Sequence, residues 1–147
     1  MSASIHELHI DVAVNLDEVR IVFSIGSLAL EGDLPASIFH MKLILDDIGN
    51  WSAKSELVAV FHTTAGHVTL NDTAYNAARN IETGNPYRLL VVDLVRRGVK
   101  IELCGATAKV CGWGNEDLLP NVKVNTDAMA RTTQLVQQGF IKITEAI

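Results

Sequence analysis

The sequence predicts an α/β protein, a three-layer α/β/α sandwich built on a mainly parallel sheet of about five strands. Short runs of β-branched and other apolar residues alternate along the chain with longer segments whose apolar residues recur at helical spacing. Strands separated by helices imply right-handed crossovers, and therefore a parallel sheet that is covered on both faces. At 147 residues the chain has the length of one domain, so we expect a single domain over residues 1–147.

The first predicted strand is an additional element at the N-terminus. Leu8, Ile10, Val12, Val14 and Leu16 alternate with other, mostly polar residues, which is the pattern of a half-buried strand. A sheet of buried parallel strands has little need of such a strand, so we expect it at a sheet edge or paired with another subunit. The alternative is a hairpin with the next strand, because the connecting turn is short.

In the first half of the chain, a dense apolar run over Val19–Ile25 predicts a central strand buried on both faces. Asp33 is expected to cap the following helix, with Pro35 in its first turn. That helix carries one apolar stripe, formed by Ile38, Met41, Leu45 and Ile48. The next strand is expected over Glu56–Phe61, followed by a loop over Thr63–Leu70.

In the second half, a short helix is expected after Asp72, and Asn85-Pro86 begins a longer helix that stops at Gly98. Thr126 or Asp127 is expected to cap a last helix that ends at Gly139. The remaining predicted strands are Val99–Leu103, Val122–Val124 and Phe140–Ile143.

Charge and composition argue against several classes of function. The net charge is −5, and the densest basic group is only Arg96, Arg97 and Lys100, so we expect no nucleic-acid partner. No stretch approaches the roughly 20 apolar residues of a membrane span, so we expect no membrane partner. The N-terminus has no basic and apolar leader pattern, which predicts a cytoplasmic protein whose two cysteines are reduced.

The common cofactor and catalytic motifs are missing. The segment after the first central strand lacks Gly-x-Gly-x-x-Gly, and the chain has no Walker A lysine, no Gly-x-Ser-x-Gly and no His-Glu-x-x-His. We therefore expect no cofactor, and the case for an enzyme depends on a thiol.

That thiol is Cys104, at the point where a short strand gives way to the next turn. Ligands and reactive side chains lie at the carboxyl ends of strands in open α/β sheets. Backbone N–H groups of a following helix favour an anion there, which would help Cys104 to hold a thiolate. The alternative is that Cys104 is a packing residue, because cysteine is among the most buried residue types.

Loops that follow parallel strands emerge at the same sheet edge. Ser24, Gly26, His62–His67, Cys104, Gly105, Asn125 and Thr126 should therefore share one rim. His62 or His67 could there share a proton with Cys104 or stabilise its thiolate.

A metal site is not expected, although four residues at or near this rim are of metal-ligand types: His62, His67, Cys104 and Cys111. Zinc sites usually show close pairs such as Cys-x-x-Cys, and the cysteine spacing here is longer. Cys111 lies beside Trp113 and is interpreted as a packing residue. If the intervening segment is helical, the cysteine Cα atoms are roughly 10 Å apart, too far for a disulfide.

Three segments resemble the DsrE/DsrF-like family: Val-Lys-Ile-Glu-Leu-Cys-Gly-Ala-Thr-Ala, Asp-Leu-Leu-Pro-Asn-Val-Lys-Val-Asn and Ala-Met-Ala-Arg-Thr-Thr-Gln-Leu-Val-Gln-Gln-Gly-Phe. Upstream, Leu-Val-Ala-Val-Phe-His and Leu-Asn-Asp-Thr-Ala-Tyr fit the same pattern, so the resemblance covers about Val19 to Ile143. It implies a three-layer α/β/α fold and an oligomer. The family includes sulfur-relay subunits whose strand-end cysteine passes sulfur as a persulfide, and Cys104 matches that position. The N-terminal strand and Cys111 are not part of that pattern.

The resemblance implies a sulfur carrier, sulfurtransferase-like, with Cys104 as persulfide acceptor. The shared rim, and not the resemblance, adds His62 or His67 as helper. The residues expected to surround the bound sulfur are Gly26, Gly105, Ala106, Thr107 and Asn125. Expected partners are sulfur donor and acceptor proteins and further copies of the chain, as a trimer or hexamer. Either the N-terminal segment or Thr63–Asn71 would form the contact.

The alternative is a non-catalytic, oligomeric protein of the same fold that binds a small ligand. Its site would be lined by aromatic residues chosen from Trp51, Trp113, Tyr75 and Tyr87.

Overall fold

Five parallel strands form the central sheet, in the order β6–β5–β4–β1–β7. The protein is represented by a computed structural model, in which residues 7–31 and 34–145 are described. The strands are β1 (Glu18–Ile25), β4 (Lys54–Phe61), β5 (Lys100–Cys104), β6 (Lys123–Asn125) and β7 (Ile141–Glu145). Two further two-residue strands, β2 (Leu30–Glu31) and β3 (Leu34–Pro35), pair with each other and stand apart from this sheet.

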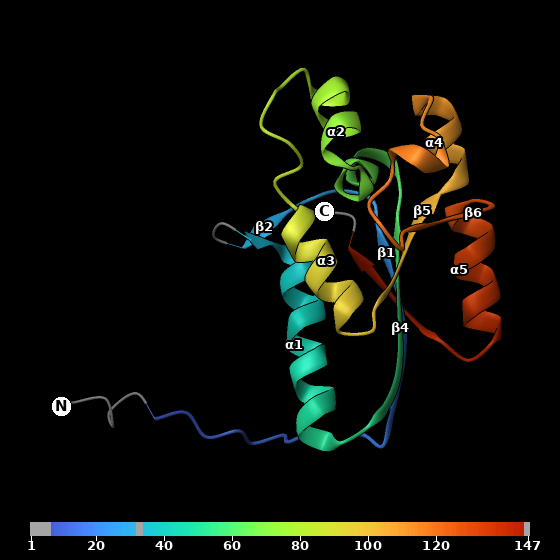
Figure 1. Cartoon of the computed structure of the whole chain (residues 1–147). Helices are drawn as coiled ribbons and strands as arrows, with labels where there is room; N and C mark the ends of the chain where they lie inside the picture. Colours follow the sequence, from blue (N-terminus) through green and yellow to red (C-terminus); the bar gives the residue numbers. More distant parts are fainter. Residues whose placement is uncertain (1–6, 32–33, 146–147) are drawn as a thin grey trace.

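Helices cover both faces of the sheet, as Figure 1 shows. α1 (Ala36–Trp51) and α3 (Arg88–Arg96) lie on one side, and α5 (Ala128–Gln137) lies on the other. The chain passes from β1 through β4 and β5 to β6 in one direction and then crosses back to β7. Since crossovers keep one hand, this reversal places α5 on the opposite face. The predicted α/β class with its five-stranded sheet is therefore confirmed.

Shorter elements follow the carboxyl ends of the inner strands. They are the 3-10 helix η2 (Thr63–Thr69), α2 (Asp72–Arg79), α4 (Gly105–Cys111) and the 3-10 helix η3 (Asn115–Asp117). None of the described helices is both long and apolar enough to cross a membrane.

The two faces of the sheet differ in their packing. On the α1 and α3 side, a large apolar cluster includes Phe23, Phe61 and Leu103, all at most 1% exposed. On the α5 side the buried cluster is smaller, and consists of Val22, Val58, Val60, Leu135 and Phe140. Polar side chains occupy the rest of the α5 face. The residues that could take part in a reaction therefore lie on that face.

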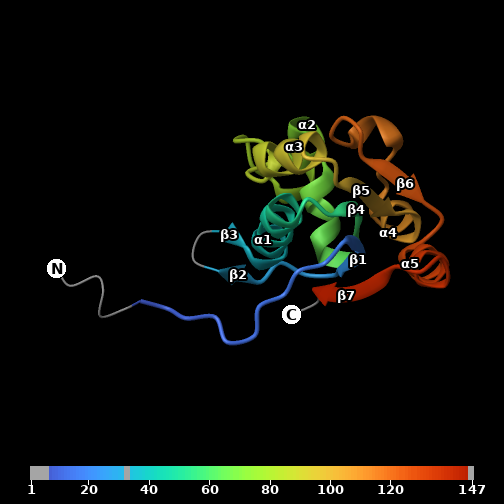
Figure 2. The same ribbon diagram turned by 90° about the horizontal axis from the view of Figure 1, so that it is seen from below.

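The strand predicted over Leu8–Val14 is not formed. Residues 7–17 have no strand pairing and bend at residues 11–12 and 17, and they lead away from the rest of the molecule (Figures 1 and 2). The alternative hairpin with Val19–Ile25 is excluded as well, because β4 and β7 occupy both edges of β1.

Side-chain hydrogen bonds, both local and long-range, explain the other differences from prediction. The segment expected as a loop after Phe61 forms η2, and Asn71 caps α2 by accepting the N–H of Ala74 at 2.9 Å. The predicted start of a helix at Asn85 is wrong, since α3 begins at Arg88 and the buried Asn85 amide donates to the carbonyls of Val68 and Leu70. Asp127 caps α5 as predicted, whereas Asp33 lies outside the described residues.

Candidate functional site

Cys104 ends β5 at the carboxyl edge of the sheet, and its thiol is turned to the α5 face. It is the N-cap residue of α4, and the whole residue is only 4% exposed. The first N–H groups of a helix have no partner within the helix, so they are free to donate to a group at the cap.

The thiol sulfur accepts a hydrogen bond from the far side of the sheet edge. The N–H of Ala128, the first residue of α5, donates to Cys104 Sγ at 3.2 Å. The backbone N–H groups of Ala106 and Thr107 and the hydroxyl of Thr107, in the first turn of α4, also favour the anionic form of the sulfur. Burial raises the pKa of the Cys104 thiol, but these polar groups outweigh burial, so the pKa lies below the ordinary value of 9.0. The thiol therefore ionises more readily than that of an ordinary cysteine.

A strained residue orients the hydroxyl donor. Thr63, which opens η2, has a φ of 50°, a left-handed conformation that β-branched residues rarely adopt. In this conformation its N–H donates to Thr107 Oγ1 at 3.0 Å. Thr63 thereby holds the Thr107 hydroxyl in place near Cys104. The sequence predicts Thr63 only as part of the His62–His67 rim and does not predict Ala128 at all, because both act through backbone N–H groups placed by tertiary packing.

His62 lies beside Cys104 on the same face, because β4 and β5 run in parallel register with Phe61 opposite Leu103. Its Nε2 is 3.1 Å from Ser24 Oγ. Burial, and to a lesser degree the charge of Lys142, lower the pKa of His62 below 6.5. The ring is consequently neutral at pH 7, so it can exchange a proton but does not supply a positive charge to the thiolate.

The lowered pKa of His62 predicts a pH dependence of stability. The unfolded chain takes up a proton near pH 6.5 while folded His62 resists it, so stability is lost as pH falls below that value. Chemical denaturation of the wild type and His62→Gln between pH 5 and 7.5 tests this. The wild type is expected to lose more unfolding free energy toward pH 5 than the variant. Parallel curves would contradict a neutral, partly buried His62.

His67 and Cys111 lie away from the thiol. The His67 ring packs edge-on against Trp113, with centroids 5.0 Å apart, and its Nδ1 donates to the carbonyl of Thr64. Cys111 is exposed at the end of α4, so the prediction that it packs in the interior is wrong. Both cysteines are free. In the described part of the chain, no group of three or more His, Cys, Asp or Glu side chains is placed to hold a metal ion.

The predicted glycines allow close approach of backbone and ring. A Cβ on Gly26 would lie 2.7 Å from His62 Cε1, and one on Gly105 would lie 2.3 Å from the carbonyl oxygen of Asn125. Gly26 thus makes room for His62, while Gly105 lets α4 begin against the end of β6.

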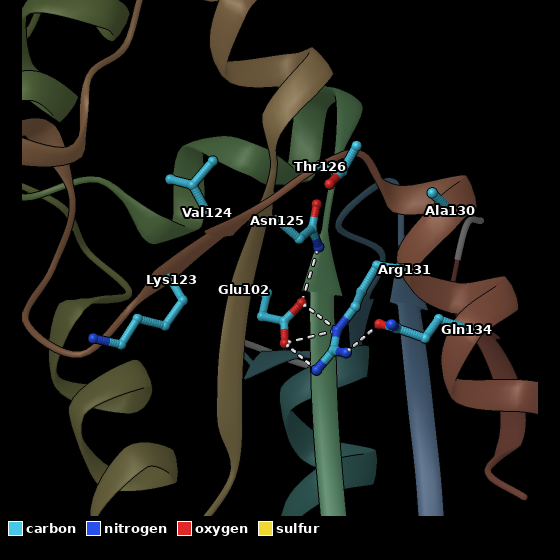
Figure 3. Close-up of a pocket in the computed structure, with 8 residues that line it drawn as sticks. All are labelled: Glu102, Lys123, Val124, Asn125, Thr126, Ala130, Arg131 and Gln134. Carbon is cyan, nitrogen blue, oxygen red and sulfur yellow. Dashed lines mark hydrogen bonds and ion pairs between the residues drawn. The ribbon is translucent and has the colours of Figure 1, made fainter. Parts of the chain in front are cut away.

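A polar cluster continues the α5 face below Cys104, and lines a cavity of about 420 Å³. The buried carboxylate of Glu102 accepts hydrogen bonds from Arg131 Nε and Nη2 and, at 3.0 Å, from Asn125 Nδ2 (Figure 3). Gln134 Oε1 accepts from Arg131 at 2.7 Å. Asn125 therefore orients Glu102 rather than facing Cys104 with its amide, and its own Oδ1 is buried with no hydrogen-bond partner among the described residues.

The comparisons with known proteins agree with this geometry. The model of the DsrE/DsrF-like family matches residues 15–144. The chain belongs to the DsrE/DsrF-like family. The family resemblance seen in the sequence is therefore confirmed, and the match begins after most of the extended N-terminal segment.

Two solved structures share the fold of this DsrE/DsrF-like protein. MTH1491, a protein of unknown function from Methanobacterium thermoautotrophicum, is 18% identical with a TM-score of 0.66, over 86% of this chain and 98% of its own. The ychN protein from E. coli is 15% identical with a TM-score of 0.59, over 88% of this chain and 99% of its own. At these identities the likeness establishes the fold alone. No curated protein matches the chain.

Proposed function

We propose that this DsrE/DsrF-like protein carries sulfane sulfur on Cys104. The observation that carries the proposal is a thiol at the carboxyl end of β5 that accepts the N–H of Ala128 at the start of α5 and whose pKa is lowered by the polar groups around it. A low pKa raises the fraction of thiolate, and the thiolate is the nucleophile in sulfur exchange.

The transfer involves no net redox change. The Cys104 thiolate attacks the outer sulfur of a donor persulfide, R–S–SH, forming Cys104–S–SH and releasing the donor thiolate R–S⁻. An acceptor thiolate then attacks the same outer sulfur, takes it as its own persulfide and regenerates the Cys104 thiolate. The N–H groups of Ala106, Thr107 and Ala128 stabilise the sulfur anion in both steps. We assign to neutral His62, opposite Cys104 in the sheet register, the uptake and return of the thiol proton.

Incubation with a persulfide donor followed by intact-mass measurement tests the proposal. The wild type and Cys111→Ser are expected to gain the mass of one sulfur atom, reversibly with a reductant, and Cys104→Ser is expected to gain none. Cys111→Ser is the matched control, because it removes the other, more exposed thiol. Equal labelling of Cys104→Ser and wild type would place the sulfur elsewhere and overturn the proposal.

Thr107 supplies a test of how the thiolate is stabilised. Loss of one hydrogen bond to a charged group costs about 1.5–3 kcal/mol, which corresponds to about 1–2 pKa units. In a Cys111→Ser background, Thr107→Val should shift the pH profile of Cys104 alkylation upward by about one unit. Thr107→Ser keeps the hydroxyl and should leave the profile near that of the parent. An unshifted profile in Thr107→Val would show that the hydroxyl does not contribute.

A second candidate function is the binding of a small anion, and a separate cavity favours it. This cavity, of about 350 Å³, is lined by Ser27, Leu28, Thr64, His67, Tyr75, Arg79 and Tyr87, with no carboxylate among them. Arg79 hydrogen-bonds Tyr75 and has no ion-pair partner in the described residues. Titration with inorganic sulfate should raise the melting temperature of the wild type and of Arg96→Gln, but not of Arg79→Gln. A uniform rise in all three would reflect a general salt effect.

A further inference from the structure

The segment 7–17, here called the arm, exposes an apolar face that a single molecule leaves in water. Its apolar side chains are Leu8, Ile10, Val12, Val14 and Leu16, and they are 43–82% exposed. They recur at every second residue, so in an extended chain they lie on one face of the arm. An apolar face of this kind is typical of a strand that pairs at a sheet and packs on one side.

The arm cannot join its own β1, because both edges of β1 are already paired. Figures 1 and 2 show the arm running away from the body of its own molecule. To pair its backbone and cover its apolar side chains, the arm therefore needs a surface with an open strand edge and exposed apolar side chains.

The same chain carries such a surface at β7. This strand ends the sheet, with β1 on one edge and no paired strand on the other among the described residues. Ile141 and Ile143 on β7 are 67% and 37% exposed and lie on the sheet face that carries Phe23. The opposite edge strand, β6, has only three residues and offers a much shorter edge. An open, partly apolar edge strand is a template for pairing with another chain.

We propose that the arm of one molecule pairs with the β7 edge of a second copy of this chain. The arm's apolar face then continues the face of Ile141 and Ile143. Its opposite face, which carries Asp11, lies on the side of Lys142, so the charges are complementary. This inference is independent of the reactivity of Cys104.

Each copy of the chain carries both partners of the contact. The arm has eleven residues and β7 has five. In an assembly in which every copy gives one arm and receives one, each copy is therefore held by two such contacts.

Light scattering at several concentrations tests the proposal. The wild type is expected to show a mass above the 16.0 kDa of one chain, and Val12→Asp should shift it to a single chain. The matched control is Ala13→Asp, which adds the same charge on the other face of the arm and should leave the assembly intact. Both positions are exposed, so circular dichroism should show the same fold in both variants. A wild type of one chain's mass at every concentration, or an assembly that survives Val12→Asp, would overturn the proposal.

Cross-linking distinguishes exchange from closure within one chain. In a background of Cys104→Ser and Cys111→Ser, Val12→Cys protein is mixed with mass-tagged Ile143→Cys protein and treated with a short bismaleimide. A product containing one copy of each is expected. In a second experiment, a chain that carries both Val12→Cys and Ile143→Cys is diluted into an excess of cysteine-free protein. Cross-links within that one chain would show that the arm folds onto its own β7, which would overturn exchange between copies.

Discussion

Gly105→Ala is expected to lower the free energy of unfolding by about 3 kcal/mol, the upper part of the range for overpacking a close-packed site. The added Cβ would lie 2.3 Å from the carbonyl oxygen of Asn125 and 2.7 Å from that of Thr126. Both atoms belong to the backbone, so no side chain can rotate to make room. Relief requires α4 to move away from the end of β6, which also disturbs the N–H groups around Cys104.

Gly49→Ala is the matched control for that substitution. Gly49 lies inside α1, and a Cβ there meets nothing within 4 Å. Alanine is preferred over glycine in a helix interior by about 0.5–1 kcal/mol, so this variant should be slightly more stable than the wild type. Urea denaturation of both variants measures the difference. Similar midpoints for the two variants would contradict the close approach of α4 to β6.

Arg131→Met is expected to destabilise the protein by about 2–4 kcal/mol, because it leaves a buried carboxylate without its counter-charge. The side chain of Glu102 is 10% exposed, and Arg131 holds it through two nitrogens. The estimate lies somewhat below that for a fully buried pair, since the Arg131 side chain is 26% exposed.

Two further variants separate the ion pair from loss of packing. Arg96→Met removes an arginine that is 75% exposed and paired with Asp93 on the same helix, and should change stability by less than about 0.5 kcal/mol. Combining Glu102→Gln with Arg131→Met removes the buried charge and should recover part of the loss. A double variant as unstable as the sum of the singles would show that packing, not charge, dominates.

The sheet could be predicted from the sequence because its strands are short and apolar, with polar or glycine-containing segments between them. Val19–Ile25 and Glu56–Phe61 differ from β1 and β4 by at most two residues at one end. The prediction of a fifth strand near Phe140 agrees with β7, since a glycine turn separates it from the helix before.

The parts that sequence could not provide depend on long-range contacts. Asn85 next to Pro86 has the pattern of a helix start, but its amide is more fully satisfied by two buried carbonyls far along the chain. The arm has the pattern of a strand, but periodicity does not reveal whether a free sheet edge lies within reach. In both cases a local preference is overridden by a partner that only the fold supplies.

The candidate site likewise has parts that could be predicted from the sequence and parts that depend on long-range contacts. Cys104 could be placed at the carboxyl end of a strand, because that position follows from strand order alone. Which histidine lies beside it could not, because η2 carries His67 away from the strand end to pack against Trp113, a contact that depends on the fold. The helix after Cys104 could be predicted, whereas the N–H of Ala128 reaches the sulfur from 24 residues further along the chain.

The small apolar cluster beneath α5 bears on how Cys104 meets its reaction partners. Only five buried apolar residues make up that cluster, so α5 is expected to open locally at a lower free energy than the central strands. Opening of its first turn withdraws the N–H of Ala128 and exposes a sulfur that is otherwise covered. The observed rate constant of Cys104 is then proportional to two equilibrium constants, one for the opening of α5 and one for the loss of the thiol proton. We expect the backbone amide hydrogens of α5 to exchange faster than those of β4. We also expect mild denaturant to raise the reactivity of the Cys104 thiol in parallel, which is the kinetic signature of a covered nucleophile.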